Sequence, residues 1–119
     1  MLKQIIQTGK PYPVYIGTGL LARSGNIFTE AIEHLSGKSV VIISDSNVMP
    51  LYGSITADSF RSAGCQVYTY EIPAGETSKN WNLLGALLEH LANLQITRSD
   101  YLVALGGGVV GDLTGFAAS

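Results

Sequence analysis

Hydrophobic residues along this chain fall into two kinds of pattern, which follow one another in a regular order. Apolar residues that run consecutively or alternate with polar ones predict strands over residues 2–7, 12–16, 40–45, 65–72 and 101–105. Apolar residues spaced three or four positions apart predict helices over residues 20–35, 49–63 and 81–94, and another from residue 109 onward. The sequence therefore predicts an α/β protein.

Glycine and proline mark several ends of these elements. A Gly-Lys-Pro break separates the first two strands, which predicts a turn and a short antiparallel pair. Pro50 near its start and Gly64 after its end bound the second helix. Beyond residue 20 helices and strands alternate, so we expect a mainly parallel, Rossmann-like sheet with helices on both faces. No repeat or linker divides the chain, and residues 1–119 are predicted to form one domain.

Composition and charge argue against several classes of function. The 119 residues are 46% hydrophobic and 13% charged, with a net charge of −2 and a pI near 5.5, so no nucleic-acid partner is expected. The lone cysteine, Cys65, cannot form a disulfide within the chain, and we expect a buried, unreactive thiol. We see neither a basic-then-apolar leader nor a long apolar span, so we expect a cytoplasmic protein with no membrane partner.

The last residues of the chain lack the usual signals of a helix end. Leu113, Phe116 and Ala117 continue an apolar stripe that begins at Val109, and neither a glycine cap, a basic last turn nor a proline follows. We therefore expect this chain to be the front part of a longer, two-domain protein.

Three predicted strands are followed by segments suited to binding a ligand. Residues 45–48, 73–79 and 106–112 lie at the ends of the third, fourth and fifth strands. The carboxyl ends of parallel strands meet at one edge of a sheet, and open α/β sheets bind their ligands there. We therefore expect these segments to form a common site.

The glycines after the last strand favour a phosphate-binding turn. Glycine permits a positive φ and lets an anion approach the backbone, while the first turn of a following helix offers N–H groups without internal partners. Gly106, Gly108 and Gly111 match the spacing G-x-G-x-x-G of dinucleotide sites. That motif normally opens the first strand–helix unit of a domain, whereas here it lies near residue 119. The spacing alone leaves open a second interpretation, in which the glycines only let a helix pack closely on the sheet.

The charged residues of these segments also allow two interpretations each. Asp45 can accept hydrogen bonds from ribose hydroxyls, and it can cap the helix that follows it. Glu76 and Lys79 share one face of a helical turn, so they can grip a nucleotide or form an exposed ion pair. Gly75 is expected to permit the turn that presents them. Asp112 can contact a cofactor, or it can be an acid in the first turn of its helix, where the dipole stabilises it.

Two histidines and a tryptophan lie outside these segments. His34 and His90 are far apart and belong to no spaced ligand cluster, so we expect ordinary surface or helix-face histidines. Trp81 belongs to a strongly amphipathic stripe and is expected to lie in the core.

Three motifs together resemble one enzyme family. The segments SDSNV, IPAGETSK and GGGVVGDLTGFAA are similar to the amino-terminal, NAD-binding part of 3-dehydroquinate synthases, and the similarity spans essentially the whole chain. Its most specific part is the glycine block with Gly111 directly before Asp112, because dehydrogenases of the glycerol dehydrogenase type usually lack that glycine. The resemblance implies that NAD contacts Asp45, Asn47, Val48, Gly75, Glu76, Lys79, Gly107, Gly108, Val109, Gly111 and Asp112.

The resemblance also implies an activity for the full-length protein. The family converts 3-deoxy-D-arabino-heptulosonate 7-phosphate into 3-dehydroquinate and phosphate in the shikimate pathway, with NAD and a divalent metal, zinc or cobalt. Its members resemble one another in forming homodimers, and their metal ligands and substrate-binding cations lie in a later domain. This chain is therefore expected to hold no catalytic or metal-binding residue and to be inactive alone. A polyol or alcohol dehydrogenase, another sugar-phosphate cyclase and a non-catalytic nucleotide-binding module remain alternatives.

Overall fold

The described residues form two separate sheets. A computed structural model describes residues 2–7, 12–75 and 81–119. The strands β1 (Leu2–Ile6) and β2 (Tyr12–Ile16) pair antiparallel in a sheet of their own. A parallel sheet with the order β4-β3-β5 contains β3 (Ser39–Asp45), β4 (Gln66–Ile72) and β5 (Tyr101–Leu105). The predicted fold class, a parallel sheet preceded by an antiparallel pair, is confirmed.

The central strand β3 is buried on both faces. Val40 and Ile42 belong to one hydrophobic cluster, Val41 and Ile43 belong to another, and none of the four has an exposed side chain. A strand that is covered on both faces reads as a continuous apolar run rather than an alternating one. This explains why the sequence pattern of β3 is so strong.

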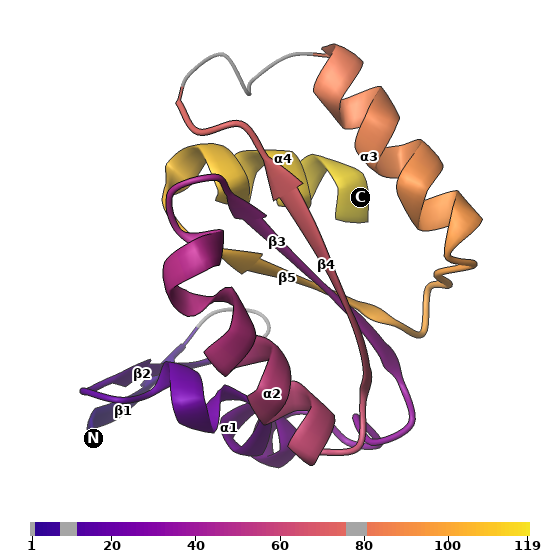
Figure 1. Ribbon diagram of the computed structural model, residues 1–119. Coiled ribbons are helices and arrows are strands. Elements are labelled where there is room, and N and C mark those ends of the chain that lie inside the picture. Colours follow the sequence, from indigo (N-terminus) through magenta and orange to yellow (C-terminus); the bar gives the residue numbers. More distant parts are fainter. Residues whose placement is uncertain (1, 8–11, 76–80) are drawn as a thin grey trace.

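Helices cover both faces of the parallel sheet, as the sequence predicts. Figure 1 shows α1 (Ser24–Ala31) and α2 (Ser54–Ser62) together on one side, with α3 (Trp81–Asn93) and α4 (Gly108–Ala118) on the other. The buried apolar residues on the side of α1 and α2 are Leu35, Val40, Ile42, Ala57, Phe60, Cys65 and Leu105. Those on the side of α3 and α4 are Val41, Ile43, Ile72, Leu87, Leu91, Val110 and Leu113. The sheet therefore separates two cores.

The first helix is shorter than its apolar spacing predicts. A 3-10 turn (Leu21–Arg23) leads into α1, which ends at Ala31 rather than at residue 35. Ile32 is already extended, with φ −122° and ψ 116°, and His34 has a positive φ of 60°. This departure from the helix lets Leu35 enter the core, where it is only 2% exposed. Burial of Leu35 thus takes precedence over the helical pattern around it.

The second helix begins with a wider turn than an α-helix. One turn of π-helix (Met49–Gly53), with Pro50 at its start, continues directly into α2. Gly64 has a φ of +95° just beyond the end of α2, a conformation that glycine adopts without strain. The predicted stop at Gly64 is confirmed.

The strand order makes the chain leave two neighbouring strands toward opposite faces. After β3 it runs into the π-turn and α2 on one face, and after β5 it runs into α4 on the other. Because β3 and β5 are adjacent, their carboxyl ends form the topological switch point at which open α/β sheets bind ligands.

The predicted core position of Trp81 is wrong. Trp81 is the first residue of α3, it is 80% exposed, and its ring lies 6.5 Å from the ring of the exposed Phe116. Helical spacing does place Trp81 on the apolar stripe, but that stripe is buried only further along α3, at Leu87 and Leu91.

The cysteine and the histidines occupy ordinary positions. Cys65 is buried as predicted, and burial raises the pKa of its thiol. His34 is exposed, and the ring of His90 tilts against that of Tyr70 with 4.7 Å between centroids. In the part of the chain that the structure describes, no helix is long and apolar enough to cross a membrane.

Candidate nucleotide-binding site

The carboxyl ends of the three parallel strands lie side by side. Asp45 of β3 is paired with Ile72 of β4, and Ser44 of β3 is paired with Leu105 of β5. The segments that follow these strands therefore begin at one edge of the sheet. The structure brings together the starts of the segments that the sequence predicts to share a site.

The glycine turn after β5 presents the start of α4 openly. Gly106 has a φ of +139°, and a Cβ at this position would lie 3.5 Å from Val110 Cγ2 and 3.9 Å from Val48 Cγ2. Gly107 is the residue before α4, and its carbonyl accepts the first helical bond from the Gly111 N–H at 3.1 Å. The amides that precede Gly111 in α4 have no carbonyl partner within the helix, so they are available to an anion.

Three of these glycines have no packing reason to be glycine among the described residues. A Cβ at Gly107, Gly108 or Gly111 would meet no atom within 4 Å, and all three positions are exposed. Close packing of α4 on the sheet therefore does not account for them. The absence of side chains on this turn leaves its amides open to an approaching ligand.

Asp45 organises the turn that follows β3. Its Oδ1 accepts hydrogen bonds from the amides of Asn47 at 2.9 Å and Val48 at 2.8 Å. Asp45 therefore closes the turn before the π-helix and is not its N-cap: the N-cap residue is Val48, which has no side-chain capping bond, so the predicted capping role is wrong. Oδ2 of Asp45 makes no hydrogen bond to another described residue, so one carboxylate oxygen remains for a ligand. Asn47 is exposed, and Val48 packs against the core on the side of α2.

Two serines beside Asp45 carry contacts that sequence analysis missed. The Ser44 hydroxyl donates to the Leu105 carbonyl at 2.7 Å in a fully buried position. The Ser46 amide donates to the Ile72 carbonyl at 2.9 Å, and its hydroxyl oxygen accepts from the Ala74 amide at 3.0 Å. Serine at a strand end is common and gives no signal in a single sequence, so only the strand order could reveal these contacts.

The segment after β4 is described only at its beginning. Gly75 has a φ of +103° and is exposed, which agrees with the predicted turn. Glu76 and Lys79, which the sequence predicts to contact a nucleotide, lie outside the described residues.

Gly111 and Asp112 face outward from α4, one turn beyond the start of the helix. They line a shallow depression of about 360 Å³ together with Gly115, Phe116 and Ser119. α4 begins at Gly108 and has no acid in its first turn, so the reading of Asp112 as a first-turn acid is wrong. The helix starts one residue earlier than the predicted start at residue 109, because Gly107 already accepts its first bond.

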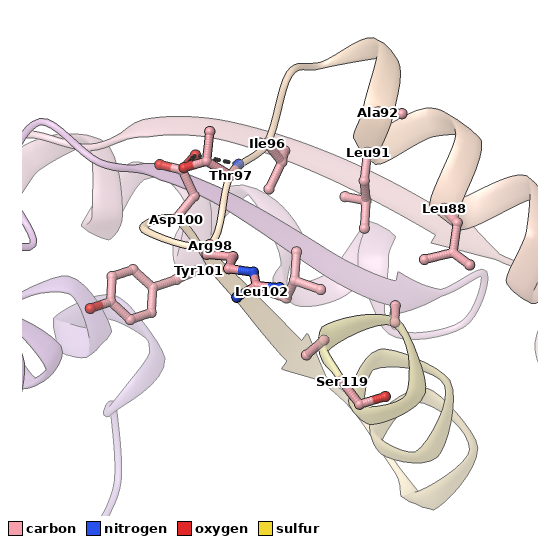
Figure 2. A pocket seen from close by; sticks show the side chains of 12 residues that line it. Leu88, Leu91, Ala92, Ile96, Thr97, Arg98, Asp100, Tyr101, Leu102 and Ser119 are labelled. Atoms are coloured by element: carbon pink, nitrogen blue, oxygen red, sulfur yellow. Dashed lines mark hydrogen bonds between the residues drawn. The ribbon is translucent and has the colours of Figure 1, made fainter.

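A larger cavity lies at the opposite edge of the sheet. It has a volume of about 740 Å³ and is framed by α3, the start of β5 and the end of α4 (Figure 2). Its walls are mainly apolar, and its carboxylate, Asp100, is already bonded to amides of the protein. We therefore place the candidate site at the carboxyl edge, where amides are open. Across the described ranges, no three His, Cys, Asp or Glu side chains gather in a way that could hold a metal ion.

The geometry defines a Rossmann-like α/β unit with its ligand-binding edge at the switch point between β3 and β5. A family model described as 3-dehydroquinate synthase N-terminal matches residues 69–119. A 3-dehydroquinate synthase from Rhizobium rhizogenes is 39% identical over 109 residues, which make up 92% of this chain and 28% of that protein. The chain is therefore similar to the amino-terminal part of 3-dehydroquinate synthases.

Solved structures of sugar-phosphate cyclases share the fold. A crystal structure of 2-deoxy-scyllo-inosose synthase has a TM-score of 0.83 and 24% identity, covering 98% of this chain and 32% of that one. The same enzyme complexed with carbaglucose-6-phosphate, NAD+ and Co2+ also has a TM-score of 0.83. A 2-epi-5-epi-valiolone synthase from Streptomyces hygroscopicus with NAD+ and Zn2+ bound has a TM-score of 0.73 and 24% identity, covering 96% of this chain and 30% of that one. The chain thus spans no more than a third of the length of these relatives.

Proposed function

We propose that this chain is the NAD-binding part of an enzyme that converts 3-deoxy-D-arabino-heptulosonate 7-phosphate into 3-dehydroquinate and phosphate, a phosphorus–oxygen lyase of the shikimate pathway. The observation that carries the proposal is the open glycine turn at the switch point, beside the carboxylate of Asp45. The 39% identity to a 3-dehydroquinate synthase supports the choice of this reaction.

The described residues fit a dinucleotide in two ways. The amides at Gly107, Gly108 and Val109 would bind the diphosphate, since they precede the first helical bond and no side chain covers the glycines. Oδ2 of Asp45 would accept hydrogen bonds from ribose hydroxyls, with Asn47 and Val48 beside it. Carboxylate at this place favours NAD over its 2′-phosphorylated form, because two negative groups would repel each other.

Other residues complete the proposed contacts. Gly111 and Asp112 extend the surface along the outer face of α4, and Gly75 leads into Glu76 and Lys79, for which ribose contacts are proposed. Bound NAD would supply a hydride acceptor that can later return the hydride to the same substrate.

The remaining parts of the enzyme are assigned to residues outside this chain. We propose that a divalent metal, zinc or cobalt, and the cations that hold the sugar phosphate belong to a later domain, and that the full-length protein is a cytoplasmic homodimer. The NAD+ with Co2+ or Zn2+ named for the two structural relatives supports this combination. This chain alone, given NAD and zinc, is therefore expected to show no turnover.

A titration of this chain with NAD+ tests the proposal. Gly108→Val places a side chain at the start of α4, where an added Cβ has open space around it, and we expect NAD+ affinity to fall at least tenfold, about 1.4 kcal/mol. Gly85→Val is the matched control, because Gly85 is an exposed helical glycine of α3 that also has open space around it. Equal NAD+ affinity in the parent chain and both variants, measured by calorimetry, would contradict the assigned site.

The full-length protein separates the cyclase from its alternatives. A polyol dehydrogenase would accumulate NADH with glycerol-like substrates, whereas a cyclase restores its NAD+ and releases phosphate. Another sugar-phosphate cyclase would release phosphate from a different sugar phosphate. The fold shared with 2-deoxy-scyllo-inosose synthase makes such a cyclase the most relevant alternative to test.

A further inference from the structure

Three consecutive residues connect the ends of all three parallel strands. Ser44 and Asp45 end β3, which lies between β4 and β5, and Ser46 follows it directly. The two serines bond in opposite directions, one to β5 and one to the segment after β4, while Asp45 bonds within its own turn. The tripeptide therefore touches each segment of the candidate site.

Ser44 holds the peptide from which the glycine turn departs. Ser44 and Leu105 form the last pair of the register between β3 and β5, and the Ser44 hydroxyl donates to the Leu105 carbonyl at 2.7 Å. That carbonyl belongs to the peptide group that joins Leu105 to Gly106. Ser44 is fully buried, so water cannot replace the hydroxyl. Orientation of this peptide sets the direction in which the amides of the glycine turn point.

Ser46 holds the opposite side of the site. Its amide donates to the Ile72 carbonyl at 2.9 Å, and its hydroxyl oxygen accepts from the Ala74 amide at 3.0 Å. These two bonds fix the first residues after β4, which lead into Gly75. Ser46 itself is exposed, so its contribution is partly replaceable by water.

We propose that Ser44 and Ser46 are positioning residues of the nucleotide site, which hold the glycine turn and the turn at residues 73–75 in place on either side of Asp45. The inference rests on the proposed function. A site that is held in its binding geometry before the ligand arrives does not lose affinity to ordering of its loops. Neither serine needs to touch the nucleotide for this effect.

Amide NMR spectra of the free chain test the positioning itself. We expect Ser44→Ala to shift the amide signals of Gly106, Gly107 and Gly108 and to speed their hydrogen exchange, and Ser46→Ala to do so at Ala74 and Gly75. The matched control is Ser59→Ala. The hydroxyl oxygen of the buried Ser59 also accepts a hydrogen bond from a backbone amide, that of Gly25 at 2.8 Å, but this bond joins α2 to α1 and lies away from the candidate site. Ser59→Ala should leave the glycine turn unchanged.

NAD+ titration of the same variants tests the effect on binding. We expect the dissociation constant to rise about fivefold in Ser44→Ala and about twofold in Ser46→Ala, as for the loss of one buried and one exposed hydrogen bond. It should not change in Ser59→Ala, although the melting temperature falls. Ser46→Thr keeps the hydroxyl and should behave as the parent chain.

The two readouts separate failure of the inference from failure of the proposed function. If the parent chain does not bind NAD+, the proposed function is wrong, and the NMR spectra still decide whether the serines hold the turns. If Ser44→Ala and Ser46→Ala change the amide signals and exchange rates of the glycine turn and of Ala74 no more than Ser59→Ala does, the proposed positioning role is wrong. If Ser44→Ala does not fold, the exposed Ser46→Ala decides by the same two measurements.

Discussion

The two edges of the parallel sheet each carry an aspartate that accepts backbone amides, but they use it differently. At the amino edge, Asp100 Oδ1 accepts from the Ser39 amide at 2.9 Å. Its Oδ2 accepts from the amide and the hydroxyl of Thr97, at 2.9 and 3.1 Å; Thr97 and Asp100 are drawn in Figure 2. At the carboxyl edge, Asp45 uses Oδ1 alone for two amides of its own turn. Both oxygens of Asp100 are bonded within the protein, whereas Oδ2 of Asp45 has no hydrogen-bond partner among the described residues.

This comparison separates a structural edge from a binding edge. Partial burial raises the pKa of Asp100, but its bonds to Thr97 and Ser39 and the charge of Lys38 together lower that pKa below its ordinary value. The protein itself therefore stabilises the ionised form. At the carboxyl edge, the amides of the glycine turn and Oδ2 of Asp45 have no such partners among the described residues, which suits a ligand that supplies them.

The largest expected effect is the loss of Asp100. Asp100→Ala removes a charged acceptor from two backbone amides, so we expect the free energy of unfolding to fall by about 2 kcal/mol. Urea denaturation measures it, and NAD+ affinity should stay unchanged. Asp58→Ala is the control, because the exposed pair of Asp58 with Arg61 at 3.1 Å is expected to matter by less than about 0.5 kcal/mol. A loss of NAD+ affinity in a folded Asp100→Ala chain would end the distinction between the edges.

The contribution of the Asp100 carboxylate to stability should depend on pH. Because the pKa of Asp100 is lowered in the folded chain, its contribution to stability is complete above the unfolded value of about 3.9 and is lost as the pH falls through the folded value. We expect the stability difference between the parent chain and Asp100→Asn to stay constant down to about pH 4 and to shrink as the pH falls further. Thermal melts above and below that pH measure it, and a difference that stays constant throughout would show that ionised Asp100 is not the stabilising form.

Asp45 is expected to affect stability less than Asp100 does. Asp45→Asn keeps an oxygen that can accept from Asn47 and Val48 and replaces the free oxygen by a donor. We expect stability to change by less than about 1 kcal/mol and NAD+ affinity to fall about fivefold. Calorimetry and urea denaturation on one sample measure both. The reverse result, a large loss of stability with unchanged affinity, would make Asp45 a structural residue like Asp100.

Most of the fold could be predicted because local patterns carry it. Continuous burial makes β3 a plain apolar run, and Gly64 ends its helix through a backbone conformation that other residues rarely adopt. Predictions failed where tertiary packing decided: Leu35 enters the core only by leaving the helical path, and Trp81 lies on the right face of α3 but beyond the buried part of that face.

The candidate site could be predicted in part for the same reason. Glycine and aspartate at strand ends have few roles, so Gly106 and Asp45 stand out in a single sequence. The role of Ser44 depends on which strand lies beside β3, and nothing local states that β5 is its neighbour. The predicted contacts of Glu76 and Lys79 stay predictions.

The amino-acid sequence by itself determined the order of strands and helices, the glycine turn, the acid at the end of β3 and the similarity to 3-dehydroquinate synthases, because each of these depends on residues that are neighbours in the chain. Only the tertiary structure decided that β3 lies between β4 and β5 and that the switch point falls beside the glycines. It also decided that both oxygens of Asp100 are bonded, whereas Oδ2 of Asp45 has no partner among the described residues. Those facts depend on contacts between residues far apart in the chain, such as the 61 positions that separate Ser44 from Leu105, and folding alone brings them together.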